Sequence, residues 1–315
     1  MTRAVESPTM SQLAGSFTAL ITPFSNDTID EPALRALVDF QVSAGIHGLV
    51  PCGTTGEVAT MTGEVATMTA AEQGRVIAIV VEQAAGRVPI VAGIGTNSTR
   101  TTIARTRRAQ ELGADAALIV TPYYNKPTQE GLFAHFSAIA DGTDLPIILY
   151  NVPGRTGVNL LPDTLARLAR MPTIAGIKEA SGVLDQVSQI VNETPDDFVV
   201  LSGDDSLTLP IMSVGSRGVV SVVANVVPGA VAALTDAWLG GDAGAARAMH
   251  RGLFDLCRAM FIETNPVPVK AAASLLGLCD AEVRLPLVPL SEPGRRRLEA
   301  ALAACPHVPA RAIAA

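Results

Sequence analysis

Short apolar stretches alternate with longer stretches in which apolar residues recur about every three or four positions. Short apolar runs between turn residues are typical of buried strands, and the longer spacing is typical of helices with one buried face. The pattern predicts eight strands, at residues 17–24, 48–52, 89–95, 116–123, 146–152, 174–178, 198–202 and 218–224. The helices predicted between them cover residues 32–44, 70–85, 99–112, 129–140, 162–170, 184–192, 206–214 and 228–239.

A regular alternation of strands and helices predicts a parallel sheet, because parallel strands need long crossover connections. Eight such units favour an α/β fold closed into a (β/α)8 TIM barrel, here over residues 14–240. A doubly wound open sheet is the alternative. After residue 240 the pattern contains helices without strands, which predicts a C-terminal helical appendage over residues 241–305. Its helices are expected at 242–261, 267–276 and 294–304.

One segment of seven residues occurs twice in succession, as Gly56–Thr62 and as Gly63–Thr69. Thr69 and Glu72 form the Thr-x-x-Glu pattern of a capping box, which marks the start of a helix. We therefore expect the next helix to begin near Thr69 and the surplus residues to loop out between residues 57 and 64. The alternative is about two additional turns at the start of that helix.

Composition removes several classes of function. Among 315 residues the net charge is −7 and no basic stripe occurs, so nucleic acid is not an expected partner. No apolar run approaches the ~20 residues of a membrane span, and the first residues do not read as a signal peptide. The four cysteines are far apart, as free thiols in a reducing compartment would be. We expect a cytoplasmic protein.

The carboxyl ends of barrel strands are where active groups of this fold lie. The predicted strand at 174–178 ends in Lys178, directly after four small or apolar residues. Apolar surroundings disfavour a charged ammonium, and a neutral amine is a nucleophile that forms a Schiff base with a ketone. The alternative is that Lys178 pairs with Glu179 or reaches water.

All three tyrosines of the chain fall on the same predicted rim, at Tyr123, Tyr124 and Tyr150. Tyrosine hydroxyls can carry protons where histidine is absent. The four histidines lie outside the rim and share no ligand spacing, so we expect no metal site. They are His47, His135, His250 and His307.

Three further side chains on the rim could hold a substrate. The planar guanidinium of Arg155 suits a carboxylate, although a solvated loop arginine is the alternative. The hydroxyls of Thr54 and Thr55 could hold a carboxylate or relay a proton, although threonine also serves turns.

Two other rim segments are better explained by local structure. Residues 93–96 contain only part of a phosphate-binding glycine pattern, so a plain strand–helix turn is favoured. Asp204 and Asp205 suit helix capping better than acid–base chemistry. The remaining set of groups, with neither metal nor dinucleotide cofactor, suits a 2-keto acid that is condensed or cleaved through an imine.

The sequence resembles a known family in six motifs. They are residues 18–24, 53–57, 123–127, 150–157, 176–179 and 265–270. With them the chain resembles the dihydrodipicolinate synthases, within the wider N-acetylneuraminate lyase family of class I aldolases, from about residue 15 to residue 290.

The resemblance implies roles for the catalytic residues. Lys178 would form the Schiff base with pyruvate, and Tyr150 would be the central proton carrier of a relay with Thr54 and Tyr124. In the family the last tyrosine reaches into a neighbouring subunit's site. Tyr124 therefore implies a homo-oligomer, with a dimer of dimers as the expected assembly.

The resemblance also implies how substrates are held. Thr55 would bind the pyruvate carboxylate, and Arg155 would bind the carboxylate of L-aspartate 4-semialdehyde. Gly203 and Val220 would line the site through backbone groups. The implied reaction is the condensation of the two substrates to 4-hydroxy-tetrahydrodipicolinate, for lysine and diaminopimelate biosynthesis, without a cofactor.

Two alternatives remain at this stage. One is an aldolase or dehydratase acting on 2-keto sugar acids, which relatives with the same lysine perform. Arg155 favours the synthase, because the sugar-acid enzymes usually lack that arginine. The other is a catalytically weak barrel that binds a keto acid and whose site is disturbed by the repeat.

Lysine-inhibited members of the family carry histidines and an acidic residue around their regulatory pocket. In this sequence Ala70 and Gln73 stand where histidines would be, and Thr101 stands where a glutamate would be, while Asn97 is retained. We expect weak or absent feedback by lysine, and strong inhibition at sub-millimolar lysine would contradict this.

Overall fold

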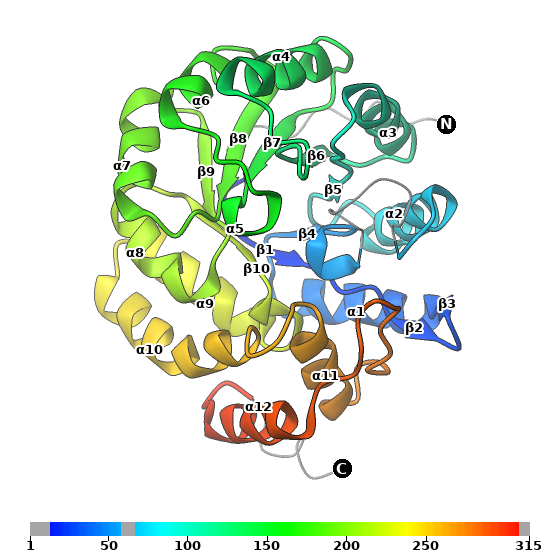
Figure 1. Ribbon diagram of the computed structural model, residues 1–315. Helices are drawn as coiled ribbons and strands as arrows, with labels where there is room; N and C mark the ends of the chain where they lie inside the picture. The colour runs from blue at the N-terminus through cyan, green and yellow to red at the C-terminus, as the bar shows by residue number, and fades with distance from the viewer. Residues whose placement is uncertain (1–12, 58–66, 309–315) are drawn as a thin grey trace.

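The computed structural model describes residues 13–57 and 67–308. Its parallel eight-stranded sheet has the order β4-β1-β10-β9-β8-β7-β6-β5, so consecutive strands of the sheet are neighbours except β4 and β5, which form its two ends. A parallel bridge between Leu49 and Ile90 joins the two end strands, which closes the ring that Figure 1 shows. The strands are β1 (Gly15–Ala19), β4 (Gly48–Val50), β5 (Val91–Gly93), β6 (Ala116–Val120), β7 (Ile147–Asn151), β8 (Ile174–Glu179), β9 (Val199–Ser202) and β10 (Gly218–Ser221).

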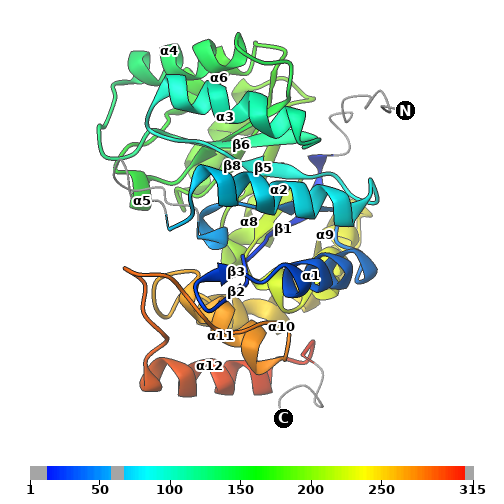
Figure 2. The same cartoon turned by 90° about the vertical axis from the view of Figure 1, so that its right-hand side faces the viewer.

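Helices surround the strands and then continue beyond them. The surrounding helices are α1 (Glu31–Ser43), α2 (Ala70–Ala84), α3 (Thr99–Glu111), α4 (Gln129–Ala140), α6 (Pro162–Leu168), α7 (Leu184–Glu193), α8 (Thr208–Ser213) and α9 (Pro228–Leu239). The C-terminal helices α10 (Ala243–Ala259), α11 (Val267–Leu275) and α12 (Glu292–Ala304) gather at one side of the barrel (Figure 2). The predicted (β/α)8 barrel with C-terminal helices is thus confirmed.

Six of the eight predicted strands extend too far at their carboxyl ends, whereas those predicted to end at 178 and 202 do not. The first was expected to reach residue 24, but β1 ends at Ala19. Leu20 and Ile21 remain buried outside the ladder, and Phe24–Ser25 instead pairs with Thr28–Ile29 in a small hairpin, β2 and β3. An apolar pattern reports burial, and segments that fold over the mouth of a barrel are as buried as its strands. Burial alone therefore cannot locate the end of a strand.

Two helical segments also differ from the prediction. The helix expected at 206–214 is a 3-10 turn, η3 (Asp205–Leu207), followed by α8. Asp204 caps η3, because its side chain accepts a hydrogen bond from Ser206 N at 2.9 Å, as expected for a capping aspartate. The short helix α5 (Pro153–Thr156) was not predicted, because four residues show no helical periodicity.

Helix α2 begins directly after Thr69, as the capping box predicts. The hydroxyl of Thr69 accepts a hydrogen bond from Glu72 N at 3.2 Å, and Thr69 N donates to the Glu72 carboxylate at 2.7 Å. The end of the repeat is therefore the start of the helix. The loop expected between residues 57 and 64 lies, beyond Glu57, outside the described residues.

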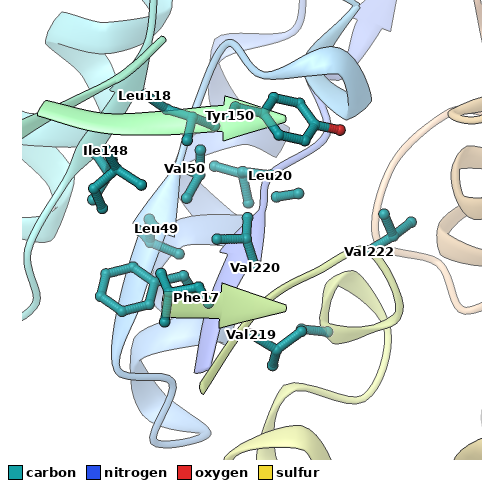
Figure 3. Close-up of a cluster of buried hydrophobic side chains, with 14 of the residues drawn as sticks. Phe17, Leu20, Leu49, Val50, Leu118, Ile148, Tyr150, Val219, Val220 and Val222 are labelled. Atoms are coloured by element: carbon teal, nitrogen blue, oxygen red, sulfur yellow. The ribbon is translucent and has the colours of Figure 1, made fainter. Parts of the chain in front are cut away.

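The barrel interior is filled by apolar side chains. Figure 3 shows apolar residues of different strands meeting in one cluster, among them Phe17, Leu49, Leu118, Ile148 and Val220. Tyr150 lies at the arrowhead end of its strand, with its hydroxyl oxygen directed away from this cluster. The packed interior thus supports a polar site at the carboxyl ends of the strands. Within the described residues, no helix has the length and apolar character needed to cross a membrane.

Candidate active site

Lys178 and Tyr150 face each other on adjacent strands. They are register partners between β8 and β7, and Lys178 Nζ lies 4.2 Å from the centroid of the Tyr150 ring. Both side chains are buried, with exposed fractions of 6% and 7%. Parallel pairing brings the two strand ends together, so a potential nucleophile and a potential proton carrier are neighbours near the mouth of the barrel.

Asn151 and Glu179, which follow Tyr150 and Lys178 on their strands, are hydrogen-bonded to each other. Asn151 Nδ2 donates to Glu179 Oε2 at 3.0 Å, and Ser181 N donates to Glu179 Oε1 at 2.7 Å. Burial raises the pKa of the Glu179 carboxyl. Successive residues of a strand point to opposite faces, so Glu179 is directed away from Lys178. An ion pair between these neighbours in sequence is therefore not formed.

Gly203 allows the close approach of a backbone segment to the lysine stem. A Cβ atom at this position would lie 2.6 Å from Ala180 Cβ and 3.1 Å from Lys178 Cε. Gly203 N donates to the Glu179 carbonyl at 2.7 Å, which holds the segment in place. Val220, on β10, is 2% exposed and belongs to the apolar cluster. Gly203 thus lies beside Lys178, and Val220 lies among the side chains that fill the barrel.

Thr54 lies in the turn η2 (Thr54–Gly56), directly after β4. Its hydroxyl is buried and has no hydrogen-bond partner among the described residues. Thr54 and Tyr150 line the same small cavity, together with Leu118 and Val120. A buried hydroxyl without a partner beside a tyrosine fits a proton-carrying role better than a turn-forming role.

Thr55 is held by a residue to which the sequence assigned no role. Asn265 Nδ2 donates to Thr55 Oγ1 at 3.0 Å, and the Asn265 carbonyl accepts a hydrogen bond from Arg155 at 3.5 Å. Thr55 and Asn265 are buried, with exposed fractions of 3% and 6%. Thr55 and Arg155, expected to bind the two substrate carboxylates, are thus connected through one asparagine.

Tyr124 lies on the surface, whereas Tyr150 is buried. Its side chain is 74% exposed, and its backbone has a φ of 70°, a conformation that is unfavourable for a bulky residue. Tyr123 is buried instead, and burial raises the pKa of its hydroxyl. The three rim tyrosines therefore have three different environments.

His135 and Gly93 lie in structural positions. His135 accepts or donates one hydrogen bond with the Thr99 hydroxyl at 2.9 Å, and burial lowers its pKa to about 4. A Cβ atom at Gly93 would lie 2.4 Å from the Cys52 carbonyl, so this glycine serves strand packing. Within residues 13–57 and 67–308, no group of three His, Cys, Asp or Glu side chains could hold a metal ion.

Three of the four residues compared with the lysine-regulated relatives line a cavity between α2 and α3. Ala70, Gln73 and Thr101 are among its lining residues, together with Arg105. Gln73 is 4% exposed and donates to the Gly93 carbonyl at 2.9 Å. Its amide is thus engaged with the barrel backbone, and weak or absent feedback by lysine stays a prediction.

Comparisons with known proteins identify the family. A protein from Thermomicrobium roseum, named 4-hydroxy-tetrahydrodipicolinate synthase, is 59% identical over 295 residues, which are 94% of this chain and 95% of that protein. A protein of the same name from Geotalea uraniireducens is 55% identical over 91% of this chain and 96% of its own length.

Solved structures give the same result. The crystal structure of dihydrodipicolinate synthase from Aquifex aeolicus superposes with a TM-score of 0.88 at 46% identity, covering 92% of this chain and 97% of that one. The family described as the dihydrodipicolinate synthetase family matches residues 12–305. The chain therefore belongs to the dihydrodipicolinate synthetase family.

Proposed function

We propose that this protein is a 4-hydroxy-tetrahydrodipicolinate synthase, a lyase that condenses pyruvate with L-aspartate 4-semialdehyde. The observation that carries the proposal is the buried Lys178, whose Nζ lies 4.2 Å from the centre of the Tyr150 ring. The relatives at 59% and 55% identity bear the name of this activity. The product serves lysine and diaminopimelate biosynthesis, and the proposal includes the cytoplasmic location expected from the sequence.

In the first half of the reaction, Lys178 Nζ attacks the C2 carbon of pyruvate. The C2 oxygen leaves as water after it has gained two protons, and an imine joins Nζ to C2. Loss of a proton from C3 then gives the enamine. Tyr150, whose ring lies beside Nζ, can accept and return these protons, and Thr54 shares its cavity.

Two residues hold the carboxylates of the substrates. We assign the pyruvate carboxylate to Thr55, whose buried hydroxyl belongs to the turn after β4. We assign the carboxylate of the second substrate to Arg155, because a guanidinium binds a carboxylate through two parallel hydrogen bonds. Fixed partners orient the enamine toward the aldehyde and supply part of the rate acceleration.

In the second half, the C3 carbon of the enamine attacks the aldehyde carbon of L-aspartate 4-semialdehyde. The aldehyde oxygen gains a proton and becomes the hydroxyl of the product, while the imine to Lys178 forms again. The amine of the condensed substrate then attacks the imine carbon. The ring closes as the bond to Nζ breaks, the two protons of the attacking amine pass to Nζ, and Lys178 leaves as a free amine.

We further propose a homo-oligomer, with a dimer of dimers as the expected assembly. Tyr124 is 74% exposed, which suits a residue that completes the proton relay of a neighbouring subunit. One structural neighbour, with a TM-score of 0.89, is described as the first monomeric dihydrodipicolinate synthase variant. Assembly therefore has to be measured for this chain by light scattering.

A coupled assay tests the proposed function. The purified protein is supplied with pyruvate and L-aspartate 4-semialdehyde, and the product is followed through its reduction by an added reductase. In parallel, pyruvate and borohydride are expected to add a stable reduced adduct to Lys178, which mass spectrometry locates. Adduct formation with turnover of a 2-keto sugar acid instead would favour a sugar-acid aldolase. Adduct formation without any turnover would favour a keto-acid-binding barrel.

The substitution Tyr150→Phe is expected to lower turnover by about 10²–10³-fold, because it removes the hydroxyl that carries protons and keeps the ring. The adduct with pyruvate should still form, but more slowly. The matched control is Tyr123→Phe, which deletes the same atom from a buried tyrosine outside the proposed relay. If the two variants lost equal activity, the role assigned to Tyr150 would be wrong.

A further inference from the structure

Helix α11 and the segment before it contact the turn after β4 and the residue that follows the turn. Asn265 Nδ2 donates to Thr55 Oγ1 at 3.0 Å, and Lys270 Nζ donates to Glu57 Oε1 at 2.6 Å. The first of these partners are 210 residues apart in the sequence. The C-terminal part of the chain thus holds the turn on both sides of Gly56, at the mouth of the barrel.

The two contacts have different consequences. The bond from Lys270 reaches a carboxylate beyond the turn, so it fixes where the backbone lies. The bond from Asn265 reaches the hydroxyl of Thr55 itself. A threonine hydroxyl has one hydrogen to donate and two lone pairs to accept with. When the amide donates to one lone pair, the hydroxyl hydrogen remains available for another acceptor.

This direction matters for binding an anion. A carboxylate is only an acceptor, so Thr55 can bind it only by donating its hydrogen. Because Asn265 presents Nδ2 to Thr55 Oγ1, the hydroxyl hydrogen is directed away from that nitrogen. Asn265 Oδ1 is buried and has no hydrogen-bond partner among the described residues. The buried position of Asn265 is therefore not explained by hydrogen bonds to both ends of its amide.

We propose that Asn265 is a positioning residue, which directs the Thr55 hydroxyl hydrogen toward the pyruvate carboxylate. The proposal deepens the proposed function and rests on it, because it takes pyruvate as the ligand of Thr55. Asn265 acts through Thr55 and does not itself bind pyruvate. Its backbone carbonyl accepts from Arg155, so a change of the side chain leaves that contact in place.

The test is a titration with pyruvate in the presence of borohydride, in which mass spectrometry measures the fraction of chains with an adduct. Asn265→Ala is expected to raise the half-saturating pyruvate concentration about 10-fold, since a hydrogen bond to a charged group is weakened. In a Thr55→Val background the same substitution should change it less than about 2-fold, because the hydroxyl through which it acts is gone.

One further variant separates the direction of the hydrogen bond from the shape of the side chain. Asn265→Asp keeps the shape of the side chain but has no donor hydrogens, so the Thr55 hydroxyl turns toward residue 265. We expect an increase at least as large as that of Asn265→Ala, whereas a purely structural role would favour the isosteric aspartate. This variant also replaces Asn265→Ala if the smaller side chain prevents folding, which thermal unfolding of each protein shows.

A matched control removes a different hydrogen bond from the same turn. Thr22 Oγ1 donates to the Gly56 carbonyl at 2.8 Å, and Thr22→Val deletes this bond. Any effect of Thr22→Val on pyruvate half-saturation should be the same with and without Thr55→Val, because it acts on the backbone.

Two results would overturn the proposal. One is an effect of Asn265→Ala that is equally large in the Thr55→Val background, and the other is normal pyruvate half-saturation in Asn265→Asp. The titration needs pyruvate alone. A protein that forms the adduct but does not use L-aspartate 4-semialdehyde would refute the proposed function and leave this test intact.

Discussion

Substitution of Lys178 by arginine is expected to lower turnover by about 10⁴-fold or more, as removal of a nucleophile does in other enzymes that use covalent intermediates. Arginine retains a positive charge and a long stem, but its guanidinium stays protonated and cannot form an imine. Lys178 is 6% exposed and lies against Tyr150 and the backbone at Gly203. The positive charge of arginine therefore cannot replace the imine bond that Lys178 forms with pyruvate.

The measurement combines the coupled assay with trapping by borohydride. The Lys178→Arg protein should show no pyruvate adduct, and its unfolding temperature should remain close to that of the unchanged protein. The matched control is Lys126→Arg, because Lys126 is an exposed lysine on the loop after β6. That variant should form the adduct normally. Full turnover in Lys178→Arg would refute the mechanism at its first step.

The part of the site that the sequence predicts is the part made by neighbouring strands. The apolar run before Lys178 marks a strand end, and so does the run before Tyr150. In a closed parallel barrel such ends meet on one rim, so the two residues are brought together by the fold alone. The same reasoning places Gly203 at the rim, where it contacts the lysine stem.

The contacts that tie the C-terminal region to the rim could not be predicted in this way. Asn265 and Lys270 belong to no barrel strand, and their partners are 210 and 213 residues distant in the sequence. Neither a period nor a capping pattern relates such positions. The motif that contains both residues was recognised only by its resemblance to a family, which gave no partner for either.

The exposed position of Tyr124 illustrates a different limit. Because Tyr124 follows β6, its sequence position predicts that it lies on the rim of the barrel. In the structure it lies in the loop after β6, with 74% of its surface exposed. Rim position alone does not show whether a side chain turns inward or outward. The positive φ of Tyr124 sets the course of the backbone in this loop. A pattern of apolar residues cannot predict such a backbone angle.

The buried ion pair between Lys270 and Glu57 leads to the second large expected effect. Both side chains are 0% exposed, and Nζ lies 2.6 Å from Oε1 and 4.3 Å from the centroid of the Phe24 ring. Burial lowers the pKa of Lys270, although the adjacent carboxylate opposes that shift. Loss of one partner leaves the other charge buried without compensation, which is more costly than loss of the pair.

Lys270→Met is therefore expected to lower the free energy of unfolding by about 3–5 kcal/mol, as measured by urea denaturation. The double variant Glu57→Gln with Lys270→Met should recover much of this loss, because no charge then remains buried. Glutamine keeps a side-chain oxygen that can accept from Arg284 N, which donates to Glu57 at 3.1 Å.

A surface pair provides the control for this measurement. Arg295 and Glu299 form an ion pair on α12 with half-exposed side chains, and loss of one partner there should cost far less, since water replaces it. If Lys270→Met were as mild as Arg295→Met, the buried pair would not hold the turn.

The double variant also links stability to catalysis. If Glu57 matters only as the charge partner of Lys270, pyruvate trapping should recover together with stability. If its carboxylate also orders the Thr54–Gly56 turn, stability should return while trapping stays impaired.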